Sequence, residues 1–306
     1  MVDEITRSDI EDAADRIAPF IRETPLLNLG HALSDRWTLA LKLENLQVTG
    51  SFKARGAFNL LLEASPARVV AASGGNFGKA VAYAAGTLDI PARIFLPETS
   101  PTEKIDAIAA HGADLELVPG FYDHALEASR AFAEANDDAF LAHAFDQHQV
   151  VAGQGTVAAE LAIQAPEASL VLVPVGGGGL IGGIASWYQG GIRVVGVESD
   201  GCASLYQGRK HGSPVEVEVS GIAASALGAR RIGDHAWSAN RWIHDAVLVD
   251  ERSIEKAQIW LWEQCRLRVE PASAVGVAAI REGLVVPEAG SLVVAVISGG
   301  NVSLGS

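Results

Sequence analysis

The sequence contains little cysteine and no long hydrophobic segment. Its two cysteines, Cys202 and Cys265, lie far apart and outside any C-x-x-C or Cys/His ligand spacing, so it predicts neither a disulfide framework nor a zinc site. The apolar runs have the length of single strands, whereas a membrane helix needs roughly 18 uninterrupted apolar residues. The start, MVDEITRSDIED, is acidic and lacks the basic and apolar parts of a signal peptide. These absences predict a cytoplasmic protein without a membrane partner.

Positive charge is also scarce. Lys and Arg number 23 against 37 Asp and Glu, which gives a formal net charge of −14 at pH 7. Nucleic-acid binding depends on clustered Lys and Arg that neutralise phosphates, so this balance argues against a nucleic-acid partner. The chain has 306 residues, of which 49% are hydrophobic and 20% charged. This composition is typical of a globular protein large enough to form two lobes.

Short apolar runs alternate with alanine-rich helical patterns along the chain. Such alternation predicts an α/β fold in which crossover helices join the strands of a mainly parallel sheet. We expect strands at residues 40–43, 68–72, 92–96, 114–118, 169–175, 193–198 and 291–298. The strand and helix signals pause around residues 146–155, which marks a candidate boundary between lobes.

Four consecutive glycines, Gly176 to Gly179, follow one of these strands and precede a helical pattern that starts at Leu180. Glycine lets the backbone come close to an anion, and the free amides at a helix start point toward it with the positive end of the helix dipole. The spacing matches neither a dinucleotide fingerprint nor a Walker loop. The segment is interpreted as a phosphate site, with a flexible turn as the alternative.

A lysine occupies an unusual position in the segment Thr49-Gly-Ser-Phe-Lys53-Ala-Arg, which opens a helix after a strand. Ser51 is the expected N-cap of that helix. Helical spacing places Lys53 on an apolar stripe, in line with Ala57, Leu60, Leu61 and Ala64. A lysine held against apolar surface loses solvation, so its neutral amine becomes available to attack an aldehyde. The alternative is a lysine that reaches water from the edge of the stripe.

Two further polar turns follow strands. Ser73-Gly-Gly-Asn76 leads into a helix, so Ser73 and the backbone amides could bind a carboxylate, although a purely structural turn is equally consistent with the sequence. Ser298 stands at the end of the last expected strand and could meet a ring nitrogen.

Taken together, these motifs resemble those of the fold-type-II pyridoxal-phosphate enzymes. The set, in order along the chain, is Thr49-Gly-Ser-Phe-Lys53-Ala-Arg, Ser73-Gly-Gly-Asn76, Gly153-Gln-Gly-Thr156, the tetraglycine run, Glu270-Pro-Ala and Ser298-Gly-Gly-Asn301. Among the branches of that family, the sequence most resembles the threonine/serine dehydratases and the related serine racemases. The resemblance implies a two-lobe, tryptophan synthase beta-like fold of twisted, mainly parallel sheets with flanking helices.

The resemblance also implies a role for each matching position. Lys53 would carry pyridoxal 5'-phosphate as a Schiff base and act as the catalytic base. The other cofactor-binding residues would be Phe52 against the ring, Asn76 at the ring hydroxyl, Ser298 at the pyridine nitrogen, and Gly176, Gly177, Gly178, Gly179 and Leu180 at the phosphate. Ser73, Gly74, Gly75 and Phe77 would bind the substrate.

The implied reaction is an α,β-elimination that converts L-threonine, L-serine or a related 3-hydroxy amino acid into a 2-oxo acid and ammonia. A large lobe of residues 1–67 and 146–306 would bind the cofactor, and a small mobile lobe of residues 68–145 would close over the substrate. The resemblance further suggests a homodimer.

Three positions depart from the family pattern. Gly74 stands where serine racemases carry a hydroxyl residue, which argues against racemisation, and Phe77 stands where dehydratases commonly have histidine. Glu198 matches the first ligand of a divalent cation site, but the second acidic position falls on Ser204, so a structural salt bridge of Glu198 is an equal alternative.

Other activities of the same fold remain open. They are a serine racemase or hydroxyaspartate dehydratase and a β-replacement synthase. A non-catalytic relative would require loss of the lysine or the glycine run, and both are present.

Overall fold

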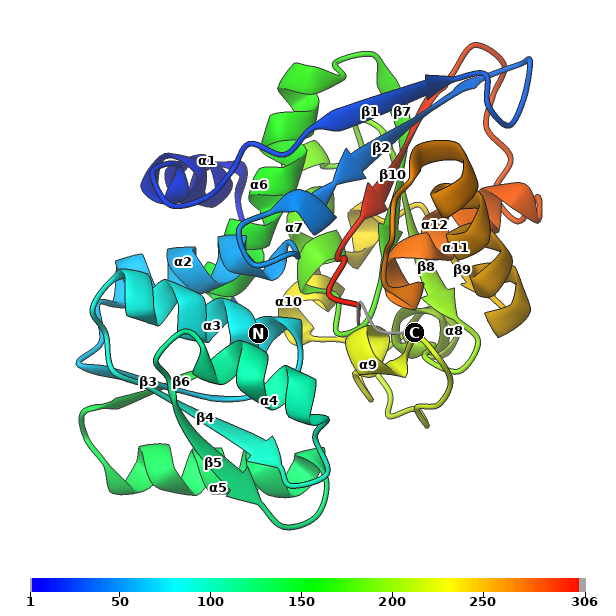
Figure 1. The fold of residues 1–306 in the computed structure, drawn as a ribbon. Helices are drawn as coiled ribbons and strands as arrows, with labels where there is room; N and C mark the ends of the chain where they lie inside the picture. The colour runs from blue at the N-terminus through cyan, green and yellow to red at the C-terminus, as the bar shows by residue number, and fades with distance from the viewer. Residues whose placement is uncertain (1, 303–306) are drawn as a thin grey trace.

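The computed structural model describes residues 2–302 and contains two β-sheets (Figure 1). The larger sheet has the strand order β1-β2-β10-β7-β8-β9, and the smaller one has the order β5-β4-β3-β6. All neighbouring strands run parallel except β1 and β2. The mainly parallel α/β fold expected from the sequence is therefore confirmed.

The larger sheet is buried at its centre. Every residue of β10 is buried, and six of the seven residues of β7 are, because helices cover both faces of a parallel sheet. Its strands are β1 (Leu26–Gly30), β2 (Thr38–Leu43), β7 (Ala168–Pro174), β8 (Arg193–Ser199), β9 (Asp245–Val249) and β10 (Leu292–Ile297).

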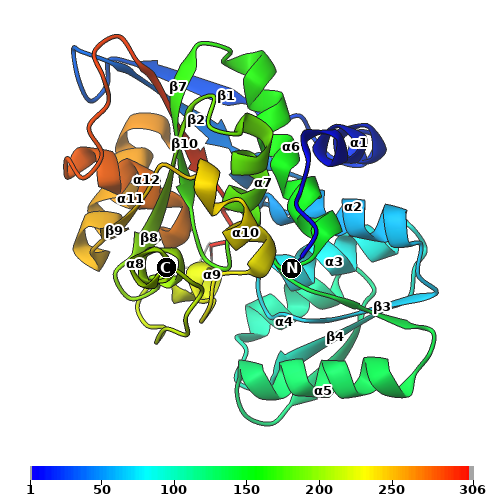
Figure 2. The ribbon, with the colours of Figure 1, turned by 180° about the vertical axis from the view of Figure 1, so that it is seen from behind.

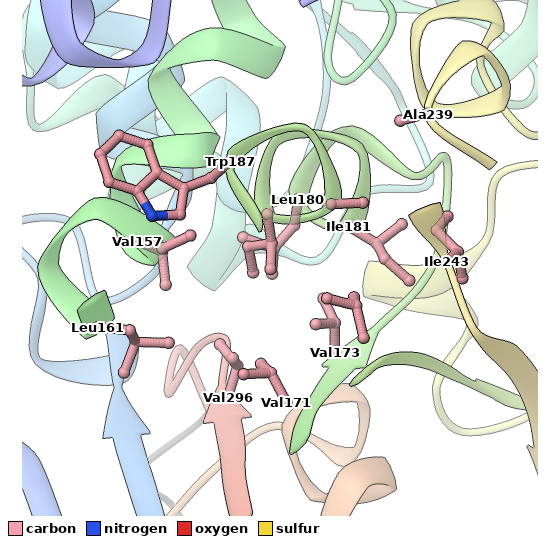
Figure 3. Close-up of a cluster of buried hydrophobic side chains, with 14 of the residues drawn as sticks. Val157, Leu161, Val171, Val173, Leu180, Ile181, Trp187, Ala239, Ile243 and Val296 are labelled. Carbon is pink, nitrogen blue, oxygen red and sulfur yellow. The ribbon is translucent and has the colours of Figure 1, made fainter. Parts of the chain in front are cut away.

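The helices around the larger sheet form two layers, seen from opposite sides in Figures 1 and 2. Side chains of α6 and α7 pack on one face, and Leu161 and Leu180 belong to the same hydrophobic cluster as Val171 of β7 (Figure 3). Side chains of α11 and α12 fill the other face. The helical segments of this part are α1 (Arg7–Ile17), η1 (Glu44–Leu46), α2 (Lys53–Ala64), α6 (His148–Gln164), α7 (Gly179–Tyr188), α8 (Ser204–His211), α9 (Ala224–Leu227), α10 (Asp234–Ser238), η2 (Asn240–Trp242), α11 (Glu251–Cys265) and α12 (Pro271–Arg281).

The smaller sheet lies within the range expected for the small lobe. It consists of β3 (Arg68–Ala72), β4 (Ala92–Pro97), β5 (Asp114–Val118) and β6 (Ala139–Ala142), with helices α3 (Asn76–Thr87), α4 (Thr102–Ala109) and α5 (Tyr122–Ala135). Helix α2 lies between the two sheets (Figure 1), and its residues Ala57 and Leu61 share a hydrophobic cluster with Val69 of β3. The division into lobes stays a prediction.

All seven expected strands are present, with ends shifted by no more than two residues. Three strands escaped the sequence analysis: β1, β6 and β9. Strand β1 is a half-buried edge strand, β6 has only four residues, and neither β6 nor β9 is a long apolar run. Within residues 2–302, every helix is too short or too polar to cross a bilayer.

A buried cluster of charges connects strand β2 with helices α2 and α6. Arg55 donates from Nε and Nη2 to both carboxylate oxygens of Glu44, at 2.8 Å each, and from Nη1 to Glu160 Oε1 at 2.6 Å. Lys42 donates to the other oxygen of Glu160 at 2.5 Å. Arg55, Glu44 and Lys42 have no exposed surface. Each charge is therefore paired and hydrogen-bonded, as burial requires.

Replacing Arg55 with Met keeps a similar volume but leaves Glu44 buried without its partner. We expect the free energy of unfolding in urea to fall by about 3–5 kcal/mol. The control is Glu11→Gln, which removes the exposed Arg7–Glu11 pair and should cost no more than ~0.5 kcal/mol. Equal losses in the two variants would contradict the importance of the buried cluster.

Candidate active site

Segments that follow four strands come together at one edge of the two sheets. Residues 44–53 follow β2, Gly176 to Gly179 follow β7, and Ser298 follows β10, three strands of the larger sheet. The carboxyl ends of parallel strands share one edge of a sheet, which is where such folds bind ligands. Phe52 N donates to Ser298 O at 3.1 Å, which joins the first and last of these segments.

The fourth segment, Ser73 to Asn76, follows β3 of the smaller sheet and reaches the same edge. Asn301 Nδ2 donates to Asn76 Oδ1 at 2.7 Å and to Thr49 O at 2.9 Å. Asn301, near the end of the chain, is thus hydrogen-bonded directly to Thr49 and Asn76, which both lie in its first quarter.

Lys53 is the first residue of α2, and its amine lies between aromatic rings. Its Nζ is 5.0 Å from the ring centre of Phe52 and 5.7 Å from that of Phe77, and it donates to Ala144 O at 2.7 Å. The side chain is half-buried, and burial lowers the pKa of the amine to about 8. No carboxylate in the described contacts of Lys53 stabilises its charge, so a reactive neutral amine is readily reached.

The expected N-cap at Ser51 is wrong. Phe52 is the N-cap residue, and its side chain makes no capping bond. Ser51 instead forms a strand-like bridge with Gly299, which takes its backbone away from a capping geometry. Ser51 Oγ and Thr49 Oγ1 are buried and have no hydrogen-bond partner among the described residues. Two buried, unpaired hydroxyls on the segment that leads to Lys53 fit a site that receives a polar ligand.

The tetraglycine segment leads into α7, which starts at Gly179, one residue before the predicted start. Gly178 is the N-cap with φ +87°, a conformation that favours glycine. A Cβ on Gly177 would lie 2.2 Å from the ring of Phe145, so packing alone also demands glycine there. The first amides of α7 have no partners within the helix, and an anion placed beside them would meet the positive end of the helix dipole. The segment fits a phosphate.

The Ser73 turn precedes α3, whose first residue is Asn76. Ser73 Oγ accepts from Gly75 N at 3.3 Å. A Cβ on Gly74 would lie 3.1 Å from Ser100 Oγ, so a larger residue there would require its neighbours to move. Phe77 is buried, with 3% exposure, in the hydrophobic cluster of the smaller sheet. The turn therefore places backbone N–H donors next to the apolar side chain of Phe77.

The side chain of Asn76 is hydrogen-bonded to Glu270, a partner that the sequence analysis did not predict. Asn76 Nδ2 donates to both carboxylate oxygens of Glu270, at 3.0 and 2.8 Å, and Asn301 N donates to Glu270 Oε1 at 2.9 Å. Burial raises the pKa of Glu270. The motif Glu270-Pro-Ala had drawn attention to this residue, but its partner 194 positions away could not be read from spacing.

Glu198 is held by protein donors. Leu205 N and Tyr206 N each donate to its carboxylate at 2.8 Å, and Ser204 Oγ donates at 3.3 Å. Burial raises its pKa to about 7 despite these hydrogen bonds. The salt bridge that was one alternative for Glu198 is absent among the described residues, and the N-terminal amides of α8 bind its carboxylate instead. Among residues 2–302, no group of three His, Cys, Asp or Glu side chains could hold a metal ion.

The loop around Phe145 also belongs to the site and carried no signal in the sequence. Ala144 O accepts from Lys53, and the ring of Phe145 packs against Gly177. Asp146 Oδ1 lies 3.0 Å from both N and Nδ1 of His235. Although burial raises the pKa of Asp146, the hydrogen bonds from His235 hold it below its ordinary range. This loop connects the lysine to the glycine segment.

Comparison with known families and proteins agrees with this arrangement. A family model described as pyridoxal-phosphate dependent enzyme matches residues 17–299. The L-threonine ammonia-lyase of Geobacter sulfurreducens is 35% identical, over 96% of this chain and 75% of that protein. The L-threonine ammonia-lyase of Thermotoga maritima is 36% identical, over 98% and 76%.

Solved structures are similar over nearly the whole chain. Maize serine racemase has a TM-score of 0.92 and 30% identity, covering 99% of this chain and 95% of that one. The serine racemase of Dictyostelium discoideum has a TM-score of 0.87 and 31% identity, covering 98% and 99%. A threonine deaminase has a TM-score of 0.91 and 33% identity, covering 98% and 100%.

The lowered pKa of Lys53 can be tested on protein freed of bound aldehydes with hydroxylamine. Acetylation of Lys53, followed by mass spectrometry across pH, should show a midpoint near pH 8 because only the neutral amine reacts. The unfolded chain keeps its proton up to roughly pH 10.4, so the contribution of Lys53 to stability rises with pH across that interval. A labelling midpoint near roughly 10.4 would contradict the apolar setting.

Proposed function

The chain belongs to the pyridoxal-phosphate-dependent enzyme family, and from this premise we propose that it is an ammonia-lyase that deaminates 3-hydroxy amino acids. Its substrates are L-threonine, L-serine or a related 3-hydroxy amino acid, and its products are a 2-oxo acid and ammonia. The observation that carries the proposal is the place of Lys53. Its amine, with a pKa lowered to about 8, is connected through Ala144 and Phe145 to the glycine segment at the start of α7.

The residues present fit pyridoxal 5'-phosphate. The unpaired hydroxyls of Thr49 and Ser51 and the free amides of α7 provide a polar lining, and the two phenyl rings beside Lys53 provide an apolar one. The residues that would hold the cofactor are Lys53, Phe52, Asn76, Gly176, Gly177, Gly178, Gly179, Leu180 and Ser298. When bound, it supplies an electron sink for the charge left on the substrate α-carbon.

Lys53 has two tasks. It would hold the cofactor covalently, and its amine, when free, would remove the α-proton of the substrate. A general base works best when its pKa lies near the operating pH, and burial brings the pKa of Lys53 into that range. The phenyl rings of Phe52 and Phe77 beside the amine keep that environment apolar.

The substrate carboxylate would bind at Ser73, Gly74 and Gly75. The start of α3 and the Ser73 hydroxyl are donors of the right kind. The ring of Phe77 makes the proposed pocket less polar, so we expect this residue to influence which 3-hydroxy amino acid is preferred. The two oxygens of Glu270 lie too close together to receive one diverging hydrogen each from Asn76 Nδ2, so one amide hydrogen is shared between them and the other is left to donate to the ring hydroxyl.

Racemisation is the second candidate because of the similarity to maize serine racemase. Gly74 offers no hydroxyl of its own, although Ser100 Oγ lies 3.1 Å from where a Cβ on Gly74 would stand. Hydroxyaspartate dehydratase and β-replacement activities use the same lysine and remain alternatives. We further propose a cytoplasmic homodimer in which the lobe of residues 68–145 closes over the substrate.

The proposal predicts an absorbance band near ~410 nm from the lysine-linked cofactor. In Lys53→Ala the band should vanish, and formation of 2-oxo acid and ammonia should fall by about 10³-fold or more because the catalytic base is lost. L-threonine, L-serine and L-threo-3-hydroxyaspartate should be compared, with chiral analysis of the remaining amino acid. Lys210→Ala, at an exposed position of α8, is the matched control and should behave as wild type.

Three other outcomes would change the assignment. A band without 2-oxo acid would replace elimination by β-replacement. Accumulation of the D-amino acid would favour a racemase. Absence of the band after cofactor addition would exclude the catalytic role of Lys53.

A further inference from the structure

Two separate segments of the chain pack against the tetraglycine run. One is the loop between β6 and α6, where a Cβ on Gly177 would lie 2.2 Å from the ring of Phe145. The other is the start of α10. Gly233 N donates to Gly177 O at 3.0 Å, and a Cβ on Gly178 would lie 2.4 Å from the side chain of Ile232. The arrangement of the glycines therefore depends on where both segments lie.

Asp146 joins these two segments. Its Oδ1 lies 3.0 Å from both N and Nδ1 of His235, the second residue of α10. Against the effect of burial, which raises the pKa of Asp146, the hydrogen bonds from His235 hold it below its ordinary range, so the carboxylate is ionised at neutral pH. An ionised carboxylate can only accept, so both nitrogens of His235 donate to it. A Cβ on Gly233 would lie 2.8 Å from this carboxylate, so α10 approaches it closely.

The link is shielded from water, and it also fixes the loop that carries Asp146. The side chains of His235 and Asp146 are only 13% and 20% exposed. Asp146 N donates to His143 Nδ1 at 2.9 Å, and His143 N donates to Gln147 Oε1 at 2.9 Å. Phe145 lies between these bonded residues, so the position of its ring depends on Asp146.

A run of glycines needs such support from outside. Several backbone amides bind one anion only when their N–H groups point toward the same place. Glycine has more backbone freedom than any other residue, so four in succession lose much entropy when they adopt one arrangement. Contacts that hold the arrangement before the ligand arrives remove that cost from binding.

We propose that Asp146 is a positioning residue for the cofactor phosphate: by binding His235 it keeps Phe145 and α10 together on the glycine segment. This inference rests on the proposed function, because the ligand of that segment is a phosphate only if pyridoxal phosphate binds there. Asp146 acts through the glycines and not by contact, since a carboxylate has no hydrogen to offer a phosphate.

The test compares two ligands that differ only in the phosphate, pyridoxal 5'-phosphate and pyridoxal. Their affinities are measured by fluorescence titration of the full chain after bound aldehydes have been removed with hydroxylamine. In Asp146→Ala we expect the affinity for pyridoxal 5'-phosphate to fall about tenfold, because hydrogen bonds to a charged group are lost, and the affinity for pyridoxal to change less than about twofold. The ³¹P resonance of the holoenzyme at saturating cofactor should also shift.

Two further variants examine the contact itself. Asp146→Asn keeps an oxygen that accepts from His235 N but loses the charge, so its affinity for pyridoxal 5'-phosphate should fall only about two- to threefold. In Asp146→Ala combined with His235→Ala, the loss should be no greater than in Asp146→Ala alone, because the two residues act through one contact.

Asp250→Ala is the matched control. Asp250 also accepts from a backbone N–H at the start of a helix, that of Ser253 at 2.7 Å, but its helix α11 packs on the other face of the larger sheet. Loss of this cap should lower the free energy of unfolding and leave both affinities unchanged.

The outcomes separate the two proposals. Equal losses of affinity for both ligands in Asp146→Ala would make Asp146 a general structural residue and overturn its proposed role. Unchanged affinity for pyridoxal 5'-phosphate would also overturn that role and leave the proposed function intact. If Asp146→Ala fails to fold, Asp146→Asn decides: a loss confined to the phosphorylated ligand supports the role, and no loss overturns it. Failure of the wild-type protein to bind pyridoxal 5'-phosphate would overturn both proposals.

Discussion

The buried ion pair between Arg55 and Glu44 is the constraint on which the site depends. It fixes the first turn of α2 against the end of β2, and Glu160 extends the same cluster to α6. Isolated charges in a core are costly, so moving any of these three elements apart would leave a buried charge without its partner. Lys53 precedes Arg55 by two residues on the same helix, so the ion pairs of Arg55 also hold the backbone that carries the Lys53 amine.

The parallel topology then brings distant segments to the lysine. Strands β2, β10 and β7 are neighbours in the larger sheet, so the residues after them meet at one edge. The smaller sheet presents the turn after β3 to the same place, where Asn76 and Asn301 are hydrogen-bonded. Site residues are therefore supported by the hydrophobic cores of both sheets.

The site has an apolar part around Lys53 and a polar, hydrogen-bonded part opposite it. The amine of Lys53 lies among phenyl rings and a backbone carbonyl, which favours its neutral form. The opposite part, around Asn76, Glu270 and Ser298, is a network of paired polar groups. An aldehyde-binding amine needs the first environment, and recognition of a polar heterocycle needs the second. Their proximity explains how one cofactor can be both held and activated.

The sequence by itself determined the fold class, seven of the strands and the identity of the chemical motifs, because these depend on local periodicity and on residue types. Local pattern could not detect β6, which is four residues long, and it misplaced Ser51 as a helix cap because the bridge to Gly299 lies across the fold. Likewise, the hydrogen-bond partners of Glu198 and Asn76 and the packing of Phe145 against Gly177 are visible only in three dimensions. Hydrogen bonds and steric contacts between distant residues depend on where parallel strands end in space, and only the tertiary structure decides that.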